Sequence, residues 1–490
     1  MALNLRKPPS LKSKFDAYPY QLDAFMAVKD LPYAAIFHEQ GLGKTKIAID
    51  ISLYWLTKDI VDTVFIVTKK SLVQNWVNEV ASHSHITPSI LSGKKGNNNV
   101  KLNSPVIVYI LNYEVISSNL ELISFFLETR KVGVILDESQ KIKNPESKLT
   151  KSFFEISNKF NRRIIMTGTP VANRPYDIWS QIYFLDFGQS LGTSFKEFKS
   201  QTDLPKQKDS HSENFIDSLT KTWQSLQSFS MRETKESSGI ELPSKTIYTQ
   251  IVELENEQVQ IYDNYQNQLT HELVDVNGKI IIDDADYILK QLLRLTQCAS
   301  NPAIIDKSYK NLPAKFKLLQ NIVLDVINNK QKVIIWTNFI ANVNWLAAHL
   351  KEYNPVKIHG SIAIDRRNLS IDKFKNDASC KVMIATPGAA KEGLTLTVAN
   401  HAVFYDRSFS LDDYLQAQDR IHRISQTQEC KVINLIAKNT IDEWVDRLLN
   451  AKYQASKLTQ GDIAKKEFID KFEFNLSDML QQVLHKNIKE

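Results

Sequence analysis

Residues 34–45 of this chain are Ala-Ala-Ile-Phe-His-Glu-Gln-Gly-Leu-Gly-Lys-Thr. The apolar residues that open this stretch predict a buried strand, and Ile47, Ala48, Ile51 and Trp55 follow at the spacing of a helix. A strand, a tight glycine-containing loop and a helix, in this order, predict a loop that binds phosphate groups. The alternative interpretation is a glycine-rich turn in front of a surface helix.

The residues of this loop suit a nucleoside triphosphate and its magnesium ion. Gly41 and Gly43 allow backbone N–H groups to approach phosphate oxygens, and the following helix N-terminus adds partial positive charge. Lys44 reaches the β- and γ-phosphates, and the hydroxyl of Thr45 ligates Mg²⁺. His38 stands where the strict pattern has glycine, so the match is good but incomplete.

The composition is that of an ordinary globular protein. The chain has 490 residues, of which 43% are hydrophobic and 24% charged, and this length suggests two or three domains. No apolar run is long enough to predict a membrane span, and the basic residues near the N-terminus lack the apolar core of a signal peptide. Three scattered cysteines indicate a reducing compartment. The net charge of +6 allows a polyanionic partner without requiring one.

Two regions of the chain alternate short apolar runs with longer helical patterns. The runs are residues 64–67, 106–109, 132–136 and 164–166 in the first region and 333–336, 382–385, 402–405 and 432–435 in the second. Such runs predict buried parallel strands, and the fold class is therefore α/β with two lobes, each a sheet covered by helices on both faces. Between residues 186 and 313 the strand signal fades. There we expect helices at 257–274 and 284–298 and an exposed loop at 201–213.

Asp137 and Glu138 follow the apolar run 132–136 directly, so they lie at the carboxyl end of a strand. Ligands of open α/β sheets bind at that edge. Asp137 would hold Mg²⁺ together with Thr45, and Glu138 would position and activate the attacking water. The alternative is an acidic turn that caps the next helix. The phosphate loop earlier in the chain favours the metal-binding and catalytic interpretation over this alternative.

Gln416, Arg420 and Arg423 have the spacing of one helical face. Two guanidinium groups placed in this way clamp a γ-phosphate and stabilise the transition state in trans. A solvated helix face is the alternative. The order of the motifs, with a phosphate loop in the first lobe and an arginine pair late in the second, favours a triphosphate shared by both lobes.

Six motifs in order resemble those of the Swi/Snf-like ATPases, a branch of the superfamily-two helicases. The resemblance extends from Tyr18 to about Leu449 and is carried by residues 18–21, 38–45, 67–72, 137–144, 167–170 and 416–426. It includes Thr-Gly-Thr-Pro at 167–170 and Gln-Ala-Gln-Asp-Arg-Ile-His-Arg-Ile-Ser-Gln at 416–426. Gln140 stands where the family usually has histidine, and Lys69 stands where it usually has proline.

The resemblance implies two RecA-like lobes in tandem with helical insertions between them. We place lobe one at residues 1–225, a linker and helical insertion at 226–312, lobe two at 313–449 and a helical tail at 450–490. The resemblance further implies that ATP and Mg²⁺ are the cofactors. Additional nucleotide contacts would come from the base-reading pair Tyr20 and Gln21 and from Gln140, Gly393 and Gln416.

The same resemblance implies contacts with the phosphates of a nucleic-acid duplex. The implied residues are Lys69, Lys70, Ser71 and Asn112 in lobe one and Asn338, His359, Gly360 and Thr386 in lobe two. Lysines, hydroxyls and backbone N–H groups at strand ends suit phosphates and carry no base information. We therefore expect binding that is independent of sequence and sensitive to salt.

The resemblance implies a DNA-stimulated ATP hydrolase that acts on double-stranded DNA as a translocase or remodelling motor. Two alternatives stay open, namely a strand-separating or branch-migrating helicase and a module that binds a partner when ATP closes it. We expect a separate targeting or effector protein as a partner and no membrane. The expected location is the cytoplasm of a bacterial cell or of a virus-infected host cell.

Overall fold

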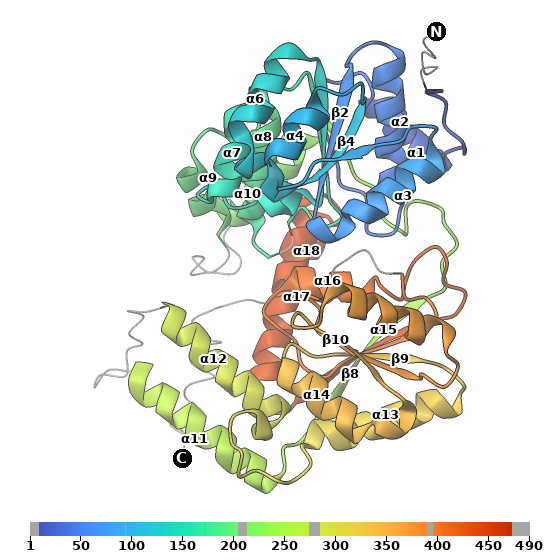
Figure 1. Cartoon of the computed structure of the whole chain (residues 1–490). Helices are drawn as coiled ribbons and strands as arrows, with labels where there is room; N and C mark the ends of the chain where they lie inside the picture. The colour runs from blue at the N-terminus through green and yellow to red at the C-terminus, as the bar shows by residue number, and fades with distance from the viewer. Residues whose placement is uncertain are drawn as a thin grey trace. The chain divides into compact units, whose positions relative to one another are not determined.

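The computed structural model describes residues 9–93, 95–171, 173–203, 213–273, 285–389 and 395–472. Within these residues the chain forms two compact units, of which the first comprises 9–203, 213–240 and 455–469 and the second 241–454 and 470–472. Each unit is built around one sheet of parallel strands (Figure 1). The predicted fold class, α/β with two parallel-sheet lobes, is confirmed. The predicted loop at 201–213 lies mostly outside the described residues.

The sheet of the first unit has seven parallel strands in the order β3-β4-β2-β5-β6-β1-β7. The strands are Tyr33–Ile36 (β1), Thr63–Thr68 (β2), Ser89–Ile90 (β3), Val108–Asn112 (β4), Val132–Asp137 (β5), Arg162–Met166 (β6) and Ser230–Met231 (β7). The run predicted at 106–109 begins two residues later, at Val108, and continues to Asn112. Because all strands run in the same direction, their carboxyl ends lie along one edge of the sheet.

Helices cover both faces of this sheet. They are Pro19–Val28 (α1), Lys44–Thr57 (α2), Val73–His83 (α3), Lys95–Leu102 (α4), Tyr113–Ser118 (α5), Leu120–Thr129 (α6), Lys148–Ile156 (α7), Trp179–Asp186 (α8), Phe195–Thr202 (α9) and Glu213–Leu226 (α10). Strand β5 shows how the layers form, since Ile135 packs into the cluster containing Trp55 of α2, whereas Val134 and Leu136 pack with Phe153 of α7. Alternate residues of one apolar strand thus enter two different cores, as a parallel sheet with two covered faces requires.

The second unit has a six-stranded parallel sheet in the order β10-β11-β9-β12-β13-β8. The strands are Lys245–Val252 (β8), Val333–Trp336 (β9), Val356–Ile358 (β10), Val382–Ala385 (β11), His401–Phe404 (β12) and Cys430–Ala437 (β13). Two strands, β7 and β8, lie between residues 186 and 313, where the sequence pattern gave only a faded strand signal. Strand β8 lies at the edge of the sheet, pairs within the described residues with β13 alone and leaves Ile247 and Ile251 exposed, so it lacks the continuous apolar run of a central strand.

The helices of the second unit are Asn256–Leu273 (α11), Ala285–Ser300 (α12), Ala314–Asn328 (α13), Ile340–His349 (α14), Ile364–Asn376 (α15), Leu411–Gln418 (α16) and Ile441–Thr459 (α17). The helices predicted at 257–274 and 284–298 are α11 and α12, which lie side by side (Figure 1). A buried ion pair fixes α13 against α17, with Lys315 Nζ 2.5 Å from Asp442 Oδ2. Lys315 also donates to the carbonyl of Tyr405, at the end of β12.

The tail returns to the first unit. Residues 455–459 of α17 and the start of Lys465–Lys471 (α18) belong to that unit, although α17 begins in the second. Arg232 makes two hydrogen bonds to the carboxylate of Asp462, at 2.9 and 2.7 Å, and one to the carbonyl of Phe37. The segment predicted as linker is likewise divided, because 226–240 belongs to the first unit and 241–312 to the second.

Gly133→Ala should destabilise the first unit. A Cβ at Gly133 would lie 2.8 Å from two ring atoms of Trp55, which is fully buried. Overpacking of this kind costs about 1–3 kcal/mol of unfolding free energy, measured by thermal or denaturant unfolding. Gly96→Ala is the matched control, because no atom lies within 4 Å of its added Cβ. Equal stability of the two variants would contradict this account of the packing.

None of the helices in the described part of the chain combines the length and apolar character that a bilayer crossing needs. The three cysteines, Cys298, Cys380 and Cys430, are buried and form no disulfide.

Candidate functional site

The loop between β1 and α2 has the backbone geometry of a phosphate cradle. Gly41 and Gly43 have φ angles of +92° and +67°, in the left-handed region that favours glycine, and α2 begins at Lys44. Lys44 Nζ donates to the carbonyl oxygens of His38 (2.8 Å) and Glu39 (3.2 Å), so the ammonium is held over its own loop. Thr45 occupies the first turn of α2, as the metal-ligand prediction requires.

Gln21 packs directly on the loop. Its Nε2 donates to the carbonyl of Leu42 (3.2 Å), and a Cβ at Gly43 would overlap that nitrogen. Tyr20 lies beside it, with its hydroxyl 3.3 Å from the same Nε2, and burial raises the pKa of Tyr20 to about 12. The predicted base-reading pair thus lies next to the phosphate loop, although the Gln21 amide also has a structural role.

His38 is buried at the start of the loop. Its pKa is lowered to about 3, first by burial and then by the positive charges of Lys44 and Arg232, so the imidazole is neutral. The Thr-Gly-Thr-Pro motif contacts the same loop, because a Cβ at Gly168 would lie 3.0 Å from the backbone nitrogen of Gln40. Close packing at Gly168 therefore joins the end of β6 to the phosphate loop.

Asp137 is held at the end of β5 by two donors. Trp76 Nε1 and Thr68 Oγ1 donate to its Oδ2, at 2.8 and 3.0 Å. Burial, followed by the charge of Glu138, raises the pKa of Asp137 to about 6, against the effect of these hydrogen bonds and of Lys44. The tyrosine hydroxyl of Tyr113 donates to the Asp137 carbonyl and fixes the backbone there.

Glu138 has a left-handed backbone conformation, with φ at +57°. Two donors meet its Oε2, namely Lys69 Nζ at 3.2 Å and Gln140 Nε2. Burial alone would raise the pKa of Glu138, but the ammonium groups of Lys69 and Lys44 and the Gln140 hydrogen bond hold it below its usual value. Of the predicted nucleic-acid contacts, Lys69 is therefore placed against Glu138, the acid predicted to activate water.

These residues fit a magnesium nucleotide. The Lys44 charge acts on the pKa values of both Asp137 and Glu138, so the loop and the acids lie close together in one unit. Two neighbouring half-buried carboxylates repel each other unless a cation lies nearby, and Mg²⁺ commonly takes one or two protein oxygens and completes its shell with phosphates and water. Among the described residues, no group of three or more His, Cys, Asp or Glu forms an all-protein metal cage.

The prediction that Gln416, Arg420 and Arg423 share one face of a helix was wrong. Helix α16 ends at Gln418, and the two arginines lie in the turns that follow. The N–H groups of Arg420 and Ile421 bond three residues back, to Ala417 and Gln418, and beyond the helix the Arg420 and Ile421 carbonyls accept from Leu396 N–H and the Gln426 side chain.

The three side chains differ in exposure and partners. Gln416 is buried within α16, and its Nε2 donates to Asp412, one turn earlier in the same helix, at 2.7 Å. Arg420 is buried, with 2% of its surface exposed. Arg423 is half-buried and donates to the Asp419 carbonyl (3.0 Å) and the Thr395 hydroxyl (3.1 Å). Gly393, also predicted to contact nucleotide, lies outside the described residues.

The nucleic-acid candidates of the first unit follow adjacent strands. Lys69, Lys70 and Ser71 come after β2, and Asn112 ends β4, which is the neighbour of β2 in the sheet. Lys70 is exposed, whereas the side chain of Asn112 caps α5 by accepting from Val115 N–H at 3.2 Å. The sheet edge thus carries these candidates beside the acids that end β5.

The candidates of the second unit also follow adjacent strands. Asn338, the pair His359 and Gly360, and Thr386 come after β9, β10 and β11, which are neighbours in the sheet. Asn338 is positioned by Asp406, whose Oδ1 accepts its backbone N–H (2.7 Å) and side-chain amide (3.0 Å). His359 is buried, and burial lowers its pKa.

Three residues that support these sites were not predicted in their observed roles. Thr68 and Trp76 fix Asp137, and the buried Asp406 fixes the loop after β9 by also accepting from Thr337 Oγ1 at 2.6 Å. Sequence spacing could not reveal these contacts, since Trp76 and Asp137 are 61 positions apart. Thr68 and Asp406 lie at or just after the ends of strands, which is a signal that the sequence offers, whereas Trp76 lies within α3.

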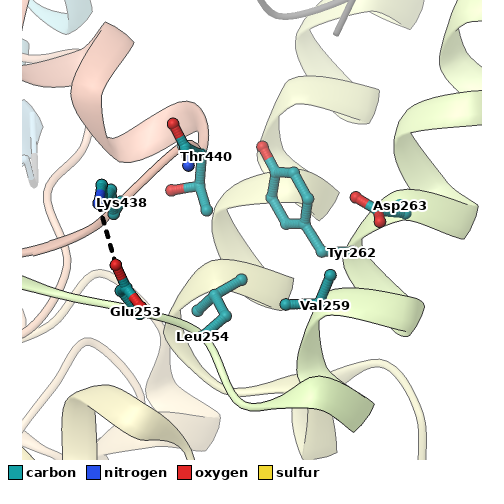
Figure 2. A pocket seen from close by; sticks show the side chains of 8 residues that line it. Glu253, Leu254, Val259, Tyr262, Asp263, Lys438 and Thr440 are labelled. Atoms are coloured by element: carbon teal, nitrogen blue, oxygen red, sulfur yellow. Dashed lines mark hydrogen bonds and ion pairs between the residues drawn. The ribbon is translucent and has the colours of Figure 1, made fainter. Parts of the chain in front are cut away.

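A cavity of about 270 Å³ lies in the second unit, and none of its lining residues is a predicted site residue. It is lined by the end of β8, the start of α11 and the loop after β13, and an ion pair of 2.9 Å joins Glu253 to Lys438 at its rim (Figure 2). Tyr262 lines it and accepts the Ile441 N–H through its hydroxyl. No motif residue faces this cavity, and we do not include it in the candidate site.

Comparison with known proteins gives a consistent result. The model described as SNF2-related domain matches residues 33–304, and the model described as helicase conserved C-terminal domain matches residues 314–425. An "Uncharacterized ATP-dependent helicase MG018" of Mycoplasma genitalium is 30% identical over 447 residues, covering 88% of this chain and 41% of that protein. The "ATP-dependent DNA helicase DDM1" of Arabidopsis thaliana is 24% identical over 466 residues, covering 88% and 59%.

A solved structure, the "Sulfolobus solfataricus SWI2/SNF2 ATPase core in complex with dsDNA", is 24% identical, with a TM-score of 0.43 and coverage of 95% of this chain and 98% of that one. The chain spans 41% and 59% of the lengths of the two relatives named above. The SNF2-related model by itself matches more than half of the 490 residues. This chain therefore belongs to the Swi/Snf-like family, the proteins that carry the SNF2-related domain.

Proposed function

We propose that this chain is a DNA-stimulated ATPase that works as a translocase or remodelling motor on double-stranded DNA. The observation that carries the proposal is the placement of the Lys44 loop, which follows β1, near the half-buried acids Asp137 and Glu138 at the end of β5, two strands away in the same sheet. Hydrolysis of a γ-phosphate needs a loop that binds the phosphates, an acid that binds the metal and a second, ionised acid that accepts a proton. Relatives with names such as "ATP-dependent DNA helicase DDM1" support DNA as the polymer.

Each residue has a distinct role in this proposal. Lys44 and the loop N–H groups bind the phosphates, Thr45 and Asp137 hold Mg²⁺, and Glu138 accepts the proton of the attacking water. Arg420 and Arg423 of the second unit stabilise the transition state of the same ATP. Closure on ATP and opening after hydrolysis would then alternate the grip of the two units on DNA. The bound magnesium supplies charge stabilisation at the transferred phosphoryl group.

The deciding experiment measures ATP hydrolysis with a panel of nucleic acids. We expect duplex DNA to stimulate turnover more than single-stranded DNA or RNA does. Stronger stimulation by forked DNA, together with strand separation, would favour a helicase or branch-migrating enzyme instead. Absence of turnover, combined with ATP-dependent capture of a protein partner, would favour a nucleotide-gated binding module.

Lys70→Ala should weaken duplex binding in a salt-dependent way. Lys70 is exposed beside the strand end of β2, where the proposal places a phosphate. Loss of one phosphate contact makes the slope of log Kobs against log salt concentration shallower by about 0.9. Binding measured by fluorescence anisotropy on two unrelated sequences checks this, and both should change alike. An unchanged slope would show that Lys70 does not contact the duplex. The control is Lys58→Ala, because Lys58 is exposed at the end of α2.

A further inference from the structure

Strand β8 presents an open edge of the sheet in the second unit. It pairs with β13 in one continuous register along all eight of its residues, and no strand in the described part of the chain lies on its other side. Sheets usually protect such an edge with prolines, charges, bulges or a short strand. Strand β8 contains no proline, Lys245 is its only charged residue, and it is longer than the typical strand of about five or six residues. This edge is therefore suited to pairing with another strand.

The hydrogen bonds to β13 fix which backbone groups of β8 point outward. The carbonyl of Ser244 accepts from Cys430 N–H, and the carbonyl of Val252 accepts from Lys438 N–H, both at 2.8 Å. The N–H and C=O groups of one residue point to the same side of a strand, and successive residues alternate. The even-numbered residues of β8 consequently face β13, and the odd-numbered residues direct their backbone groups to the open edge.

The odd-numbered side chains are complementary to a reversed copy of the same strand. Ile247 and Ile251 are 50% and 63% exposed, and the exposed Thr249 lies between them. Lys245 and Glu253 flank these three residues with opposite charges. In an antiparallel pair of two β8 strands that places Thr249 opposite Thr249, each Ile247 meets an Ile251. Each Lys245 then meets a Glu253, so the side chains directly opposite one another are matched throughout.

The same register also satisfies the outward backbone groups. Two residues directly opposite in an antiparallel ladder exchange two hydrogen bonds when their N–H and C=O groups face each other. Ile247, Thr249 and Ile251 all direct these groups to the open edge, so each finds a partner in the reversed copy. A shift by one residue would oppose outward groups to inward ones. A shift by two would keep the hydrogen bonds but separate Lys245 from Glu253.

We propose that two copies of this chain associate through β8 and form one continuous sheet across a twofold axis. The partner is a second copy because the backbone, apolar and charged groups of the edge all match the same strand reversed, as an isologous interface requires. Glu253 already pairs with Lys438, but 78% and 50% of these side chains are exposed, so that pair is weak and leaves Glu253 within reach of a second cation. The inference does not rest on the proposed ATPase function.

The test is the mass of the full chain in solution, measured by sedimentation velocity over a range of concentrations. We expect the mass to rise from one chain to two in the micromolar range. Ile251→Lys places a charge in both apolar pairs and should raise the Kd of association about tenfold or more. Leu369→Lys is the matched control, because Leu369 is 69% exposed on α15 of the same unit, and it should associate like the parent.

A pair of charge reversals tests the register itself. Lys245→Glu and Glu253→Lys each place like charges opposite one another twice in the dimer, so each variant alone should stay a single chain at concentrations where the parent is dimeric. Mixing the two variants restores opposite charges at both positions, and we expect a mixed dimer. Its formation cannot come from a folding defect, since neither variant associates by itself.

Several outcomes would overturn the inference. One is the mass of a single chain at every concentration, and another is a dimer that none of the β8 variants weakens. Masses above two chains would contradict a closed twofold pair. A mixture of the charge-reversal variants that stays monomeric would exclude this register. If Ile251→Lys does not fold by circular dichroism, the charge reversals provide the comparison, because Glu253 is exposed and Lys245 is half-buried.

Discussion

Replacing Arg423 by alanine should leave ATP binding nearly intact while lowering kcat about 10³–10⁵-fold. The guanidinium is proposed to stabilise charge that develops only in the transition state, so its loss acts on the chemical step. In the described structure it donates to the Asp419 carbonyl and the Thr395 hydroxyl, in a turn after α16. The first contact is local, the second joins Arg423 to Thr395, 28 positions earlier, and the side chain is only half-buried, so the variant should fold.

Two measurements are needed for Arg423→Ala. Calorimetry with a non-hydrolysable ATP analogue should give a Kd within about threefold of the parent, while steady-state hydrolysis with duplex DNA falls. Arg447→Ala, exposed on α17 of the same unit, is the control and should keep its turnover. Parent-like hydrolysis by Arg423→Ala would show that the second unit does not supply this group to the triphosphate.

Glu138→Gln should lower kcat about 10²–10⁴-fold, the range expected for loss of a general base. Glutamine has the same shape and still accepts a hydrogen bond from Lys69, but it cannot take a proton from water. Lys44, Thr45 and Asp137 are unchanged, so binding of the magnesium nucleotide should persist. The result is measured as single-turnover hydrolysis alongside nucleotide affinity, because a defect in the chemical step alone lowers the first and spares the second.

The control for this variant is Glu114→Gln. Glu114 is an exposed acid of α5 in the same unit, and it pairs loosely with Lys141 at 3.7 Å. We expect its turnover to stay within about twofold of the parent and its unfolding midpoint to shift little. If Glu138→Gln hydrolysed ATP as fast as Glu114→Gln, the assignment of the base would be refuted.

The sequence by itself determined the α/β class and the phosphate loop. Continuous apolar runs such as 132–136 have only one stable placement, between two helical layers, because both of their faces need cover. Gly41 and Gly43 likewise specify the loop locally, since their positive φ angles are costly for other residues. The strand pattern and the loop conformation depend on residues that are close together in the chain, and a sequence shows these residues directly.

Edge strands and helix ends were less predictable. Strand β8 has a mixed pattern because, within the described residues, one of its edges has no partner strand and its isoleucines are exposed. Helix α16 ends at Gln418, and the carbonyl of Arg420 accepts from Leu396 N–H, 24 positions earlier, and not from a further helical turn. The spacing of Arg420 and Arg423 is compatible with a helix, and only the tertiary hydrogen bonds decide that they lie in turns.

Only the tertiary structure determined which group the ammonium of Lys69 contacts. From sequence it is one of two adjacent lysines at a strand end, equivalent to Lys70 as a partner for phosphate. The fold brings Glu138, 69 positions later, within 3.2 Å of its ammonium and leaves Lys70 in solvent. An ion pair between distant positions exists only once adjacent strands β2 and β5 align their carboxyl ends, and no local pattern records that alignment.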